Sequence, residues 1–173
     1  MVYILDANVL ITAHQLYYPI DAVPEFWDWL VYQAELGGVK MPIETFDEVR
    51  DGSADAERDQ LYAWIQQEDV KKHLLLGDDA DVEQVRRVVE EGYAPDLTDD
   101  ELEQIGQDPF LVAHALGRVD ERCVVTVEVS KPRKQRQNRR VPDVCNSLGV
   151  QWCDTFKMLR DLRFATNWRH QIA

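Results

Sequence analysis

Short apolar runs rich in β-branched residues alternate along the chain with longer segments whose apolar residues recur every three or four positions. Short runs bounded by polar or turn-forming residues are typical of buried parallel strands, and the longer spacing is typical of helices. The short runs predict strands at 2–5, 39–41, 123–126 and 150–153. The longer segments predict helices at 7–14, 24–36, 42–51, 61–65, 78–91, 98–105, 110–116, 142–148 and 155–162.

Several of these helices carry residues that start or stop a helix. Thr98, with Glu101 three positions later, forms a capping-box pattern in which each side chain bonds to the other residue's backbone N–H. Asp108 and Asp154 each precede a predicted helix as N-caps, and Gly52 ends another helix. These residues set the predicted helix boundaries.

The alternation of strands and helices predicts an α/β fold with a mostly parallel sheet between helices. No internal repeat and no long linker divides the chain, so we expect a single domain. In such folds, binding sites gather at the carboxyl ends of the strands. The candidate positions are therefore Asp6, the residues after Met41, Thr126 with Glu128, and Asp154.

The charge distribution limits the partners that the protein can bind. The 173 residues include 32 acids and 19 bases, which give a formal net charge of −13. Twelve acids and only two bases lie between 78 and 108, whereas the segment 131–140, KPRKQRQNRR, holds six bases and no acid. A uniformly cationic nucleic-acid groove is therefore excluded, but a local phosphate-binding strip is not.

The sequence carries no recognisable membrane or targeting signal. No apolar run approaches the ~20 residues that span a bilayer, and no basic segment precedes the first apolar run, as it would in a signal peptide. The three cysteines are too few and too scattered for a disulfide framework. We therefore expect a cytoplasmic protein with reduced thiols.

Asp6 is the first residue that could carry chemistry. It directly follows the first predicted strand, where a carboxylate can face a crevice shared with other strands. Aspartate is also a favoured N-cap for the helix that follows. Its position alone leaves both roles open.

The segment around Asp6, VYILDANVLI, resembles the opening motif of the PIN-domain family, a strand that ends in Asp followed by x-[Asn/Ser/Thr]. Three further segments resemble motifs of that family in the same order along the chain: 48–52, 108–115 and 123–128. The resemblance covers residues 1 to about 163.

The resemblance implies a PIN-like three-layer α/β/α sandwich in which 1–173 form one domain. The acidic helical insertion at about 78–105 is longer than in minimal PIN toxins, and the basic loop 131–140 separates the fourth motif from the last strand. The family more often has Asp where this chain has Glu128.

The resemblance also implies a metal-dependent endoribonuclease similar to VapC-like toxins of type II toxin–antitoxin modules. The implied metal ligands and catalytic carboxylates are Asp6, Glu48, Asp108 and Glu128, with Asn8 and Thr126 in supporting positions. Clustered carboxylates repel one another unless a cation neutralises them, and their hard oxygens suit Mg²⁺ or Mn²⁺. Such an ion can activate water and stabilise the charge that develops at phosphorus.

Each implied residue also has a structural interpretation. Helical periodicity places Glu48 on the solvent side of its helix, and only the motif selects it over Glu44 and Asp47. Asn8 fits an ordinary first helical turn, and Thr126 an ordinary strand. These alternatives remain open at the level of the sequence, as does the role of Glu128 as a turn residue.

The basic loop could bind the backbone of RNA, dock onto an acidic partner such as an antitoxin, or remain a mobile solvated loop. Its candidate RNA-binding residues are Lys131, Arg133, Lys134, Arg136, Arg139 and Arg140. Aromatic residues elsewhere are expected in the core rather than as platforms for stacked bases: Phe26, Trp27, Trp29, Trp64 and Trp152. The four histidines show no zinc-protease spacing.

Two other functions stay open beside the nuclease. A non-catalytic PIN-like scaffold could use the acidic surface to recruit a basic partner. A phosphatase of the haloacid-dehalogenase type also begins with a strand-terminal Asp, but it needs a second Asp two residues later, where this chain has Asn8. For the toxin, the expected partners are RNA, a cognate antitoxin and a second copy of the chain.

Overall fold

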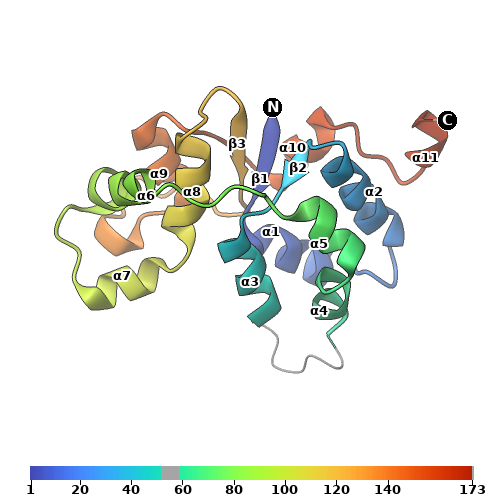
Figure 1. Cartoon of the computed structure of the whole chain (residues 1–173), viewed down its shortest axis with the longest axis horizontal. Coiled ribbons are helices and arrows are strands. Elements are labelled where there is room, and N and C mark those ends of the chain that lie inside the picture. The colour runs from blue at the N-terminus through green and yellow to red at the C-terminus, as the bar shows by residue number, and fades with distance from the viewer. Residues whose placement is uncertain (52–58, 173) are drawn as a thin grey trace.

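A four-stranded, all-parallel sheet forms the centre of the part of the chain that the computed structural model describes, residues 1–51 and 59–172. The strand order is β2-β1-β3-β4, and the strands are β1 (Val2–Leu5), β2 (Val39–Lys40), β3 (Arg122–Val125) and β4 (Gln151–Cys153). Figure 1 shows α6 to α9 on one side of this sheet and α1 to α5 with α10 on the other. The predicted α/β fold is confirmed.

Helices connect the strands and cover both faces of the sheet. The α-helices are α1 (Ala7–Thr12), α2 (Pro24–Glu35), α3 (Ile43–Asp51), α4 (Gln60–Ile65), α5 (Glu68–Leu74), α6 (Val82–Arg87), α7 (Asp99–Ile105), α8 (Asp108–Leu116), α9 (Val141–Leu148), α10 (Thr155–Asp161) and α11 (Arg169–Ile172). Shorter segments are the π-helical turns η1 (Ala13–Tyr17) and η2 (Val88–Tyr93) and the 3₁₀ turn η3 (Arg136–Asn138).

The strands separate two hydrophobic cores because successive side chains of a strand point to opposite faces. On β1, Tyr3 and Leu5 point into the core shared with α1 to α5 and α10, whereas Ile4 points into the core shared with α8 and α9. Ile4 and Leu5 are both fully buried. Burial on both faces explains why the strands read as continuous apolar runs.

The carboxyl ends of the strands bring polar residues together at one edge of the sheet. The hydrogen-bond ladder continues one residue past β1, where the Asp6 N–H donates to the Val125 carbonyl at 3.0 Å. It also continues past β3, where the Thr126 N–H donates to the Cys153 carbonyl at 3.2 Å. The backbone therefore fixes Asp6 and Thr126 beside each other.

Local signals gave most helix boundaries correctly. The capping box of Thr98 and Glu101 is confirmed, and so is the N-cap Asp154, whose carboxylate accepts from the Lys157 N–H at 2.6 Å. Gly52, predicted to end a helix, lies outside the described residues.

Other predicted boundaries were wrong. Asp108 is the first residue of α8 rather than its cap, because Gln107 already takes the capping position after the turn at Gly106. The helix predicted over 7–14 ends as an α-helix at Thr12 and continues as η1. The sequence reading missed α5, whose buried residues are few among charged ones, and it missed α11.

Two further observations concern membrane-spanning helices and cysteines. In the residues with a described structure, no helix is both long enough and apolar enough to cross a membrane. Cys123, Cys145 and Cys153 are free and buried.

We expect Gly92→Ala to lower the free energy of unfolding by about 1–3 kcal/mol, because a Cβ there would lie 2.7 Å from a methyl carbon of Val144. Val144 is β-branched and its side chain has little freedom to move away. The matched control is Gly77→Ala, where a Cβ would meet no atom within 4 Å. Denaturant unfolding measures both variants, and equal stabilities would contradict the tight packing of η2 against α9.

Candidate active site: a carboxylate cluster at the sheet edge

Asp6 is buried at the carboxyl end of β1, with 5% of its surface exposed. Its Oδ1 accepts a hydrogen bond from the Asn8 N–H at 3.3 Å, which makes Asp6 the N-cap of α1. Its Oδ2 accepts from the Asn8 side-chain amide at 2.6 Å and from the Thr126 hydroxyl at 2.7 Å. The capping role and a role in a site are therefore compatible.

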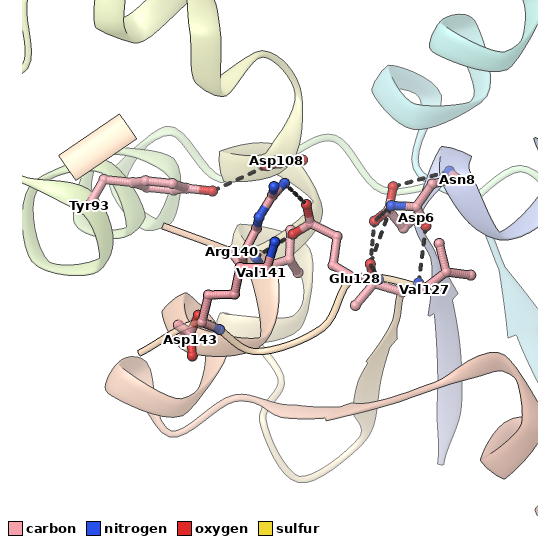
Figure 2. A network of polar contacts seen from close by, with 11 residues as sticks. Asp6, Asn8, Tyr93, Asp108, Val127, Glu128, Arg140, Val141 and Asp143 are labelled. Carbon is pink, nitrogen blue, oxygen red and sulfur yellow. Dashed lines mark hydrogen bonds and ion pairs between the residues drawn. The ribbon is translucent and has the colours of Figure 1, made fainter. Parts of the chain in front are cut away.

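Asn8 connects the end of β1 to the chain that follows β3. Its Oδ1 accepts from the Val127 N–H at 3.2 Å, while its amide donates to Asp6. The Thr126 hydroxyl also accepts from the Glu128 N–H at 3.1 Å. These contacts fix the path of the chain from β3 toward Glu128, and Figure 2 shows them around Asp6.

Asp108 begins α8, and its Oδ2 accepts from the Tyr93 hydroxyl at 3.4 Å. Burial, together with the charges of Asp6, Glu128 and Glu48, raises the pKa of Asp108 to about 8, against the opposing hydrogen bond from Tyr93. Asp6, Glu48 and Glu128 therefore lie close enough to Asp108 for their charges to act on it. We call Asp6, Glu48, Asp108 and Glu128 the acidic cluster.

The pKa of Asp6 responds to the same neighbours. Burial raises it to about 6, against the opposing hydrogen bonds from Thr126 and Asn8. The charges of Glu48 and Glu128 add to the increase. A cation placed among these carboxylates would relieve this unfavourable energy.

Glu48 lies at the rim of the cluster. As a residue it is exposed, as periodicity predicted, yet partial burial of its carboxylate raises its pKa. The two competing acids of α3 have other partners. Glu44 lies 3.4 Å from His114 Nε2, and Asp47 lies 2.8 Å from Arg50.

Glu128 is held by the chain itself. Its Oε1 accepts from Arg140 Nη1 at 2.6 Å, and its Oε2 accepts from the Val141 N–H at 2.8 Å. In Figure 2, this pair lies between Asp6 on one side and Asp108 on the other. Arg140, predicted to bind RNA, therefore neutralises one carboxylate of the acidic cluster in this structure.

The donor set fits a hydrated divalent cation only in part. Asp6, Asp108 and Glu48 provide hard carboxylate oxygens with raised pKa values. Among residues 1–51 and 59–172, however, no three His, Cys, Asp or Glu side chains lie close enough to hold an ion directly. Mg²⁺ keeps several of its waters in proteins, so it would reach part of this cluster through water. Glu128 does not fit as a ligand while it is paired with Arg140.

The basic loop is anchored rather than free. Asp143, 6% exposed at the start of α9, accepts from the Ser130 hydroxyl at 2.5 Å and from the Lys131 N–H at 2.7 Å. Arg136 pairs with Asp96 and Glu101, both at 2.7 Å. These contacts disfavour the interpretation of a mobile, solvated loop at these positions.

The six candidate RNA-binding residues divide into two groups. Arg136 and Arg140 form ion pairs with the chain's own acids, and Arg139 donates to the Asp143 carbonyl at 2.8 Å and to the Gly92 carbonyl. The other three candidates are exposed: Lys131, Arg133 and Lys134. The prediction that this loop binds RNA stays a prediction.

Sequence reasoning missed Tyr93 and Asp143. Tyr93 contacts Asp108 from the acidic insertion, and no local pattern marks a contact 15 residues away. Asp143 offered a weak signal, since it is the first acid after a run of bases.

The chain belongs to the family described as "Domain of unknown function (DUF4411)", whose model matches residues 3–166. No curated protein and no solved structure matches the chain. The family description names no activity, so a function has to be argued from the site.

We expect the metal-free protein to lose stability as the pH rises from 6 to 8.5. Asp6 and Asp108 have folded pKa values of about 6 and about 8 against an ordinary value of 3.8. The folded state therefore binds more protons in this range, and stability is lost as the pH passes through the folded pKa values. Denaturant unfolding in EDTA at both pH values measures the effect.

The matched variant is Asp108→Asn, which removes one charge and keeps the shape. It should be more stable than the wild type at pH 8.5 by on the order of 1–2 kcal/mol and should show a flatter pH dependence. Glu101 does not disturb this window, because Arg136 lowers its pKa to about 2. If the free energy of unfolding of Asp108→Asn depends on pH as that of the wild type does, the raised pKa of Asp108 is contradicted.

Proposed function

We propose that the protein is a metal-dependent endoribonuclease related to the PIN-domain family, which hydrolyses RNA phosphodiester bonds with Mg²⁺ or Mn²⁺. One observation supports this proposal most. Asp6 at the end of β1 and Asp108 at the start of α8 have pKa values raised by burial, and the charges of Glu48 from α3 and Glu128 from the chain after β3 add to both increases. That convergence is what a cation-dependent phosphodiesterase requires.

Asp6, Asp108 and Glu48 would hold the cation. When bound, the ion supplies a water of lowered pKa and stabilises the negative charge that builds up at phosphorus. The chain's own residues position Asp6, since the Asn8 amide and the Thr126 hydroxyl both donate to its Oδ2, at 2.6 and 2.7 Å. Hydrolysis of this kind leaves 5′-phosphate and 3′-hydroxyl ends.

Arg140 provides a positive charge at the edge of the acidic cluster. Its contact with Glu128 places a guanidinium beside the cluster, and guanidinium groups bind phosphate oxygens well. Release of Arg140 from Glu128 would give one group to the substrate and free one carboxylate. In the proposed reaction, the Glu128–Arg140 pair thus holds a phosphate-binding group beside the acidic cluster.

The biological setting in this proposal is a toxin–antitoxin module in the cytoplasm. Its support is the order of the four motifs that resemble those of PIN-domain toxins. A free ribonuclease would damage its own cell, so this setting requires a neutralising antitoxin protein. A second copy of the chain is a further expected partner.

The non-catalytic scaffold is the second candidate, and one observation favours it. Glu128 is neutralised by Arg140, and the described carboxylates do not form a ready-made set of three ligands. The phosphatase alternative has no such support, since Asn8 stands where its second Asp would be and instead donates to Asp6.

The decisive experiment is digestion of RNA in the presence of Mn²⁺ or Mg²⁺. We expect cleavage that EDTA abolishes and that Asp6→Asn or Asp108→Asn lowers by at least about 100-fold, the scale of losing a group that stabilises transition-state charge. The matched control is Asp120→Asn, an exposed carboxylate just before β3, at the opposite edge of the sheet. It should cleave at the wild-type rate. Absence of cleavage with every divalent ion tested would refute the nuclease and support the scaffold.

A further inference from the structure

A hollow of about 420 Å³ lies beside the acidic cluster, and Glu128 is part of its wall. Tyr17 from η1, Trp152 from β4 and Phe156 from α10 supply its aromatic side chains. We call this hollow the aromatic groove. Its volume is within the usual range for small-molecule sites.

The aromatic side chains of the groove are unusually accessible. Most of the candidate core aromatics are buried as predicted, Phe26 and Trp27 among them, but Trp152 is only partly buried. Of the large apolar side chains that the described part of the chain leaves exposed, the two aromatic ones line this groove: Tyr17, 46% exposed, and Phe156, 40% exposed. The rings of these two residues meet edge to face with centroids 5.1 Å apart.

Thr155 also lines the groove. It is 4% exposed, and its buried hydroxyl has no hydrogen-bond partner among the described residues. Because this oxygen is itself buried, the accessible surface that the groove offers a ligand comes mainly from its aromatic rings.

A cationic hollow lies next to the groove. A second hollow of about 500 Å³ shares Ser130 with it and is lined by Lys131, Arg133 and Lys134. These three side chains are exposed, unlike the arginines that anchor the loop. Ser130 thus links the aromatic groove to the cationic hollow, and Glu128 links it to the acidic cluster.

From this arrangement we infer that the aromatic groove binds one unpaired nucleobase of an RNA strand, next to the bond that is cut. The inference rests on the proposed function and adds to it a binding site for one base of the RNA. Aromatic side chains stack on bases only when the bases are not paired, and lysines or arginines beside them hold the phosphate backbone. The exposed bases of the cationic hollow favour a polyanion, and the aromatic rings favour a flat base. Because Glu128 and Asp154 are in the groove wall, the phosphates of the strand would lie on the side of the cationic hollow.

The test measures binding of a single-stranded RNA of about 12 nucleotides, a length within typical single-strand site sizes, by fluorescence anisotropy. An Asp6→Asn background prevents cleavage during the measurement. Phe156→Ala and Tyr17→Ala should each weaken binding on the order of 10-fold, whereas Phe156→Tyr should bind like the parent. The control is Leu36→Ala, which removes a more exposed apolar side chain, 62% exposed, just after α2 and should change nothing.

Abasic substitutions at each position of the strand make the test specific. One abasic position should weaken binding to the parent on the order of 10-fold but should not weaken binding to Phe156→Ala, because the ring and the base form one interaction. A fully paired duplex of the same sequence should bind more weakly than the single strand. If every abasic position lowers the RNA affinity of Phe156→Ala as much as that of the parent, the inference is overturned.

The two proposals fail in different ways. In one outcome, an abasic position weakens RNA binding only when Phe156 is present, yet the wild type does not cleave RNA in Mn²⁺. That outcome would support the groove and refute the nuclease. In the opposite outcome, the wild type cleaves RNA but the effect of an abasic position does not depend on Phe156. That outcome would support the nuclease and refute the groove. A drop from dimer to monomer in Phe156→Ala, without loss of RNA affinity, would mark the groove as an interface between copies and refute the inference.

Discussion

The burial of Asp6 and Asp108 beside the charges of Glu48 and Glu128, at one edge of a parallel sheet, is the constraint on which the site depends. Burial and neighbouring charge raise the pKa of Asp6 to about 6 and that of Asp108 to about 8. A fold that keeps such groups together gives up stability unless protons, cations or basic side chains balance the charge. Arg140 already provides this balance for Glu128. Binding at this site therefore depends on which positive group balances the charge of the carboxylates.

The parallel topology explains why these residues meet. Each strand runs in the same direction, so the chain leaves the sheet at one edge, and the ladder bonds past β1 and β3 fix Asp6 beside Thr126. Helices α3 and α8 then bring Glu48 and Asp108 to this edge from two sides of the sheet. The same edge continues through Ser130 toward the exposed bases of the loop.

Features encoded by neighbouring residues could be predicted from the sequence. Strand runs, the capping box of Thr98 and the cap at Asp154 depend on residues a few positions apart. Long-range pairings have no such local signature. The Glu128–Arg140 and Tyr93–Asp108 contacts depend on where α9 and η2 pack, and periodicity alone placed Glu48 in solvent. The candidate cluster was thus found by its motifs, whereas its charge balance required the three-dimensional arrangement.

The central claim is that the acidic cluster binds one or more divalent cations in exchange for protons. Titration calorimetry of Mn²⁺ at pH 7, in two buffers of different ionisation enthalpy, measures binding and proton release together. The account predicts saturable binding with proton release, because the Asp108 pKa of about 8 leaves its carboxyl mostly protonated at that pH. Release should fall in Asp108→Asn. Absence of Mn²⁺ binding, or binding that Asp6→Asn and Asp108→Asn leave unchanged, would contradict the account.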